Sequence, residues 1–191
     1  GGEGHVVEID ETSLKKKSKY NRGTQHPDCW LFGGFDRTSK KWFGILVEDD
    51  RTKPTLSQII RQYIRPDTLI MSDMWSSYVS VTKKGTVHSL ENNRWLTDMG
   101  YAHKWVNHSE NFVDPVTGAH TQGIEGTWEV KVKQNIKSMR GCSKKMVASY
   151  LDEYLWKSWF LPPKPTVTDI PPKPTVTDTL NGIVNGIKKH Y

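Results

Sequence analysis

The sequence is poor in cysteine and has no long apolar run. Cys29 and Cys142 are the only cysteines among 191 residues, and neither belongs to a CxxC or Cys/His spacing, which argues against a structural zinc site. Two isolated cysteines are typical of buried thiols in a reducing compartment. A run of about 18 apolar residues and a charged-then-apolar leader are both missing, so we expect a soluble, intracellular protein with no membrane partner.

Acidic residues are outnumbered. The 27 Lys and Arg exceed the 21 Asp and Glu, which gives a net charge of +6 and a pI near 9.2. This balance favours a polyanionic partner without identifying one. The chain begins with "GGEGHVVEID" and no methionine, so we expect that a preceding domain is missing.

Aromatic residues are plentiful, and the length suits one domain. Eight Trp, seven Tyr, five Phe and 35% hydrophobic residues are typical of a globular protein. We predict a domain over residues 1–160. The remainder, 161–191, contains "PPKPTVTDI" followed by the near copy "PPKPTVTDT". Because these prolines disfavour helix and sheet, we interpret 161–191 as an extended linker and tail, with a proline-rich ligand for a partner as the alternative.

Apolar periodicity predicts strands first and helices later. The stretch 83–104 has no clear pattern. We expect strands at 5–10, 29–37, 41–50, 69–73 and 103–109, and helices at 55–64, 121–139 and 144–160. Thr55 and Gln58 form a capping-box pattern for the first helix. In the second helix, Ile124, Trp128, Val132 and Ile136 recur at every fourth position. This order is typical of an α+β or α/β layered domain.

Two carboxylates lie where apolar strands stop. Asp10 closes the first strand and Asp73 closes the strand that follows the first helix. If these strands are parallel neighbours, both acids meet at one edge of the sheet, where a cation relieves their repulsion. Glu125, in the first turn of the helix from Thr121, would complete a site for Mg²⁺. The alternative is that all three are ordinary solvated carboxylates or helix caps.

The motifs "EIDET", "WLFGGFDR", "SDMWSSY" and "GYAHKWVNHSENFVDPVTGAHTQGIEGTWEVKVK" resemble the catalytic domain of Merlin-type transposases and of related bacterial insertion-sequence transposases of the DDE class. The resemblance covers residues 6–160. It implies an α/β, RNase H-like (retroviral-integrase-like) fold with a mixed sheet of about five strands flanked by helices. It further implies cleavage and strand transfer at transposon ends.

By position in these motifs, the catalytic acids of the family fall on Asp10, Asp73 and Glu125, and these would bind two Mg²⁺ or Mn²⁺ ions. Glu129 is the rival of Glu125, and Glu8 and Glu11 are lesser rivals of Asp10. The implied partners are transposon-end and target DNA, within a homo-oligomer. The implied compartment is the nucleus in a eukaryote, or the nucleoid and cytoplasm in a bacterium.

Basic residues follow two of the three acids along the chain, and phosphate contacts are the corresponding hypothesis. Solvated charged faces are the alternative for these clusters, and structural roles are the alternative for the two histidines beside the loop 109–119. The candidates for nucleic-acid binding are Lys15, Lys16, Lys17, Lys19, Arg22, His108, His120, Lys131, Lys133, Lys137 and Arg140.

Two departures from the family pattern keep other functions open. Relatives carry a basic residue two turns after the helix acid, where this chain has Val132, and the stretch from Tyr78 to Gly100 is longer than usual. A domesticated DNA-binding or interaction module without chemistry is one alternative. An RNase H-like nuclease without strand transfer is another.

Overall fold

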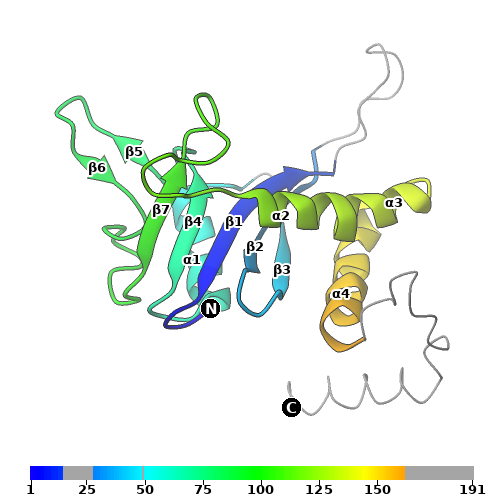
Figure 1. Cartoon of the computed structure of the whole chain (residues 1–191). Coiled ribbons are helices and arrows are strands. Elements are labelled where there is room, and N and C mark those ends of the chain that lie inside the picture. Colours follow the sequence, from blue (N-terminus) through cyan, green and yellow to red (C-terminus); the bar gives the residue numbers. More distant parts are fainter. Residues whose placement is uncertain (15–27, 49, 162–191) are drawn as a thin grey trace.

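The computed structural model describes residues 1–14, 28–48 and 50–161, and its centre is a five-stranded mixed sheet (Figure 1). Helices cover both faces of this sheet. The strands are β1 Val6–Ser13, β2 Trp30–Asp36, β3 Trp42–Glu48, β4 Leu69–Asp73, β5 Ser80–Val81, β6 Val87–His88 and β7 Ala102–Val106. The helices are α1 Lys53–Tyr63, α2 Gln122–Thr127, the π-helical η2 Trp128–Lys133, α3 Gln134–Ser138 and α4 Lys144–Phe160.

The strand order is β3-β2-β1-β4-β7, with β1 at the centre. β1, β2 and β3 form an antiparallel meander, whereas β1, β4 and β7 run parallel to one another. The short strands β5 and β6 form a separate hairpin between β4 and β7. The carboxyl ends of β1, β4 and β7 therefore point to the same edge of the sheet.

Each face of the sheet has its own apolar core. On one face, Val7, Ile9 and Ile70 pack against α1 through Leu56 and Ile60. On the other face, the strands pack against α2, η2 and α4. Leu31, Trp42, Ile124, Trp128, Val132, Val147, Leu151 and Tyr154 make up this second core. Burial on both faces explains the nearly continuous apolar run of β2, whereas the central strand β1 carries Glu8, Asp10 and Glu11 among its apolar residues.

A wide turn lies in the middle of the second predicted helix. α2, η2 and α3 follow one another without a break from Gln122 to Ser138, and the central turn is π-helical. Four residues advance an α-helix by about 40° more than one turn, so a spacing of four drifts off the buried face. The wider turn compensates for this drift. Ile124, Trp128 and Val132 consequently all face the sheet and are at most 1% exposed.

Most of the predicted elements are confirmed, with shifts at their ends. β1 continues to Ser13, so Asp10 lies inside the strand and not at its exit. The capping box is wrong, because α1 begins at Lys53 after Thr52, and the Thr55 hydroxyl donates to Asp50 instead. The unassigned stretch 83–104 contains β6 and the start of β7, and β5, which pairs with β6, lies just before it. Within the three described ranges, no helix is long and apolar enough to cross a membrane.

Candidate active site

Asp10 and Asp73 lie at the same level of two neighbouring parallel strands. β1 and β4 pair with Val6 opposite Leu69 and Glu8 opposite Met71, and the same offset of 63 residues separates Asp10 from Asp73. Because side chains alternate along a strand, the two carboxylates also share one face of the sheet. This is the face that α2 covers, since Glu8, two residues before Asp10, bonds to the backbone of Ile124.

Burial and neighbouring negative charge perturb both carboxyl groups. Burial, followed by repulsion from Asp73 and Glu125, raises the pKa of Asp10 to about 7. The pKa of Asp73 is also raised, mainly by burial, with Glu125 adding to the rise. The backbone N–H of Trp75 donates to Asp73 Oδ1 at 3.1 Å and opposes that rise. The three acids therefore lie within electrostatic reach of one another.

Glu125 reaches this edge from the first turn of α2. Its side chain is 51% exposed, and the Thr121 hydroxyl donates to its Oε1 at 2.6 Å. His108 Nε2 lies 3.0 Å from the Thr121 hydroxyl and 3.6 Å from Glu125 Oε1. His108 also lowers the pKa of Asp73, which places its ring near the second carboxylate as well. Thr121 and His108 thus hold Glu125 beside the sheet edge.

Trp128 packs the same helix against the strand neighbour of Asp10. Gly33 is paired with Asp10 across β1 and β2. A Cβ on Gly33 would lie 2.6 Å from Trp128 Cη2 and 2.1 Å from the Phe43 carbonyl oxygen, so only glycine leaves room for the indole. The buried Trp128 Nε1 makes no full hydrogen bond within the described ranges. Its N–H nevertheless lowers the pKa of Asp10, which indicates that it points toward that carboxylate.

The rival acids lie elsewhere. Glu8 is 1% exposed and bonds to Arg37 and to the backbone N–H of Ile124. Glu11 points to the opposite face of β1 and accepts a hydrogen bond from the Tyr78 hydroxyl. Burial raises the pKa of Glu11 to about 8, while the Tyr78 bond lowers it in part. Glu129 is exposed and points away from the buried residues Trp128 and Val132 of η2.

Part of the predicted basic surface follows Glu125 along its helix. Lys131 and Lys137 are exposed, Lys133 is half-buried, and Arg140 is exposed just after α3. His120 contributes its backbone oxygen to Arg37. Val132 is fully buried, so packing explains the absence of a basic residue there. The predicted cluster Lys15, Lys16, Lys17, Lys19 and Arg22 and the predicted tail at 162–191 lie outside the described residues.

The donor chemistry of this edge fits a divalent cation. Asp10, Asp73 and Glu125 offer carboxylate oxygens, the ligands that Mg²⁺ prefers. No three His, Cys, Asp or Glu side chains in the described part of the chain form a closed coordination shell. Asp10 and Asp73 are fixed by their strands, whereas the exposed Glu125 carboxylate is turned toward Thr121 and His108. To join the other two acids at one ion, Glu125 would have to leave Thr121 and His108.

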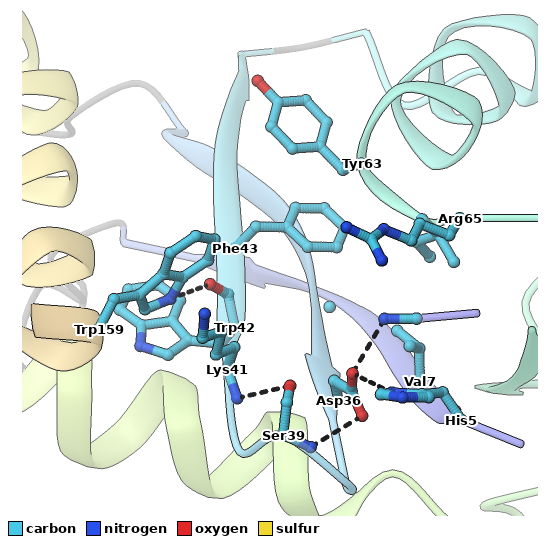
Figure 2. Close-up of a pocket in the computed structure, with 13 residues that line it drawn as sticks. His5, Val7, Asp36, Ser39, Lys41, Trp42, Phe43, Tyr63, Arg65 and Trp159 are labelled. Carbon is cyan, nitrogen blue, oxygen red and sulfur yellow. Dashed lines mark hydrogen bonds and ion pairs between the residues drawn. The ribbon is translucent and has the colours of Figure 1, made fainter. Parts of the chain in front are cut away.

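A cavity of about 320 Å³ lies at the other end of the sheet, where β1 begins and β2 turns into β3 (Figure 2). Its carboxylate, Asp36, accepts hydrogen bonds from the N-terminal amine, from His5 and from the Thr38 N–H. Burial alone would raise the pKa of Asp36, but these bonds hold it well below its usual range. This carboxylate is already satisfied by its hydrogen-bond partners, in contrast to Asp10 and Asp73 at the other end of the sheet.

Sequence reasoning missed the residues that support the acids. Arg37 ends the motif "WLFGGFDR", but neither its charge nor its position indicated its bond with Glu8. Tyr78 likewise ends the motif "SDMWSSY", and nothing in the sequence indicated its bond with Glu11. Thr121 directly precedes the helix, which is a usual capping position, but its hydroxyl bonds to Glu125 and does not cap the helix.

Two solved structures of low sequence identity share this fold. One is a chain of the simian T-cell lymphotropic virus intasome in complex with PP2A regulatory subunit B56 gamma, with 14% identity and a TM-score of 0.53. The match covers 91% of this chain and 60% of that chain, so our chain spans less than two thirds of its length. The other is the catalytic core domain of BIV integrase, with 11% identity and a TM-score of 0.50 over 97% of this chain and 98% of that one. The predicted RNase H-like, integrase-like fold is confirmed.

A search among curated proteins found no match. The sequence profile of the ISXO2-like transposase domain, in contrast, matches residues 2–158. This match confirms the resemblance to insertion-sequence transposases of the DDE class, and the narrower resemblance to Merlin-type transposases stays a prediction. The chain therefore belongs to the ISXO2-like transposase domain family.

Proposed function

We propose that Asp10, Asp73 and Glu125 together hold two divalent cations, Mg²⁺ or Mn²⁺, and that this site cleaves transposon ends and joins them to target DNA. One observation carries the proposal. Burial and the charges of Asp73 and Glu125 raise the pKa of Asp10 to about 7. Carboxylates gathered at such energetic cost are typical of a cation site.

The surrounding residues suit this assignment. Bound cations would activate a water or 3′-hydroxyl and neutralise charge on the leaving oxygen during in-line phosphoryl transfer. Glu125 starts on Thr121 and His108 and would turn from them toward the cations, whereas Asp10 and Asp73 are already held by their strands, and Asp73 also by the Trp75 N–H. Fixed carboxylates of this kind reduce the reorganisation needed during the reaction. The rigid strand register sets the spacing of Asp10 and Asp73.

DNA contacts follow from the same helix. Lys131, Lys133, Lys137 and Arg140 continue from Glu125, so a phosphate backbone that enters the site would run along them. Such contacts give affinity with little sequence discrimination. We propose that Lys15, Lys16, Lys17, Lys19 and Arg22 extend this surface, that His108 and His120 border it, and that two copies of the protein pair two transposon ends.

Incubation with pre-nicked end DNA, a plasmid target and Mg²⁺ or Mn²⁺ tests the proposal. Joined end-target products are expected. Nicking without joining would indicate a nuclease, and retention of DNA without cleavage would indicate a silent binding module. D73N should abolish the chemistry and leave DNA binding intact, because it removes an oxygen ligand without changing the fold. Unchanged turnover in D73N removes Asp73 from the site.

A further inference from the structure

The first turn of the helix that carries Glu125 is hydrogen-bonded to the central strand. The carboxylate of Glu8 is 1% exposed, and its Oε2 accepts the backbone N–H of Ile124 at 2.9 Å. The first N–H groups of a helix lack partners within the helix, and a side chain just before it usually accepts one. Thr121 stands at that position and makes no capping bond. Glu8 therefore caps α2 from a strand that lies more than 100 positions earlier in the chain.

Arg37 also joins the same carboxylate to the segment just before α2. Arg37 Nε donates to Glu8 Oε1 at 2.6 Å, and Arg37 Nη2 donates to the backbone oxygen of His120 at 3.0 Å. A carboxylate this deeply buried is stable only with such charged and hydrogen-bonding partners. Both oxygens of Glu8 are thus engaged, one with Arg37 and one with the helix. This arrangement removes Glu8 from the possible metal ligands.

The contact between strand and helix leaves no room for a side chain at Gly123. A Cβ there would lie 2.9 Å from Glu8 Oε1 and 2.7 Å from Phe35 Cδ1. A Cβ on Gly126, one turn later in the same helix, would have no neighbouring heavy atom within 4 Å. The close approach is therefore confined to the side of α2 that meets Glu8.

We propose that Glu8, supported by Arg37, is a positioning residue that sets where Glu125 stands relative to Asp10; this inference rests on the proposed metal site. Glu8 and Asp10 share one face of β1, and Ile124 and Glu125 are consecutive in α2. A single bond from Glu8 to the Ile124 N–H therefore fixes the spacing between the first and third carboxylates. Because Glu8 caps the helix, the Thr121 hydroxyl stays available to hold Glu125.

Two variants disturb this spacing by different routes, and each has a matched control. E8Q keeps the shape of the side chain but loses the ion pair with Arg37, and E3Q makes the same change at an exposed position. G123A pushes α2 away from Glu8 and Phe35, although alanine favours helix. G126A adds the same methyl group in open space. G123A leaves both charged side chains, Glu8 and Arg37, in the protein, so it tests the spacing even if E8Q does not fold.

Mn²⁺ affinity measured by electron paramagnetic resonance, together with amide exchange by mass spectrometry, gives the readout. E8Q and G123A should bind Mn²⁺ at least tenfold more weakly and exchange faster at 122–128, with β1 and β4 protected as in the wild type. E3Q and G126A should match the wild type in both measurements. Wild-type Mn²⁺ affinity in E8Q and G123A overturns the proposal. Faster exchange that spreads equally over β1 and β4 overturns it as well, because it indicates general destabilisation.

D73N separates this inference from the proposed function. Wild-type Mn²⁺ affinity in D73N rejects the metal site itself. Loss of affinity in D73N, combined with retained affinity in E8Q and G123A, rejects the role of Glu8 alone.

Discussion

His103 Nε2 lies 2.9 Å from the hydroxyl oxygen of Ser72, the residue directly before Asp73. The other ring nitrogen, Nδ1, accepts the backbone N–H of Leu90 at 3.2 Å, so Nε2 carries the proton and donates to Ser72. The Ser72 hydroxyl in turn donates to the Asp73 carbonyl oxygen at 2.6 Å. The end of β4 is thereby tied to β7 by a neutral histidine.

Stability should fall with pH below the ordinary pKa of histidine because His103 stays neutral in the fold. Burial lowers its pKa to about 3. Between pH 6.5 and about 3 the unfolded chain binds a proton that the folded chain does not, so the folded state loses about 1.4 kcal/mol per pH unit. Urea denaturation of the wild type and H103N should show a difference that shrinks as the pH falls. A difference that is constant between pH 4.5 and 7.5 contradicts this account.

The titration of Asp10 should change stability with pH in the opposite direction to that of His103. Burial and the charge of Asp73 raise the pKa of Asp10 in the folded state to about 7. Between about pH 4 and 7 the folded chain binds a proton that the unfolded chain does not, so the free energy of unfolding falls as the pH rises through this range. D10N should therefore have a higher free energy of unfolding than the wild type at pH 8 in EDTA, by up to about 4 kcal/mol, measured by urea denaturation. Added Mn²⁺ should stabilise the wild type and leave D10N unchanged. A destabilised D10N in EDTA would show that Asp10 has structural partners instead.

Substitution of Glu125 should reduce strand transfer far more than substitution of Glu129. E125Q removes a carboxylate beside Asp10 and Asp73, and we expect strand transfer to fall roughly 100-fold or more. E129Q changes an exposed group outside the site and should stay within about threefold of the wild type. Joining assays at saturating Mn²⁺ measure both. The reverse ranking would move the third ligand one turn along the helix.

Gly33 should tolerate no side chain. G33A places a Cβ 2.1 Å from the Phe43 carbonyl oxygen and 2.6 Å from Trp128 Cη2, so β3 or the indole must move. We expect a loss of about 3 kcal/mol in the free energy of unfolding. G126A, which fits in open space, serves as the reference in thermal denaturation. Equal melting temperatures for the two variants would contradict the tight packing of Trp128 on the sheet.

Lys131 and Lys137 should contribute to DNA affinity without sequence preference. Each alanine variant is expected to weaken binding to end DNA and random DNA alike. The slope of log Kd against log salt concentration should also fall by about 1 per lysine removed. Fluorescence anisotropy at several salt concentrations measures both effects. A loss restricted to end DNA would mean that these lysines read sequence.

The alternation of apolar runs located β1 to β4, α1, α2 and α4, because burial on one or both faces leaves a strong periodic signal. Asp10 and Asp73 were selected as candidates because each follows an apolar run, and their catalytic role stays a prediction. The supporting contacts were not recognisable. The bond from Glu8 to Ile124 joins residues far apart in sequence and depends on how α2 meets the sheet. The β5–β6 hairpin has strands of two residues, too short for any periodic pattern.

The π-helical turn from Trp128 to Lys133 separates the end of the helix that carries Glu125 from the end that carries Lys137. Upstream of it, the rotation of the helix about its axis is set by the packing that orients Glu125. Downstream, the same rotation decides which way Lys137 projects. Deletion of one residue from this turn would leave the acid in place and rotate the basic end by about 100°, so the two ends can change their orientation independently in evolution.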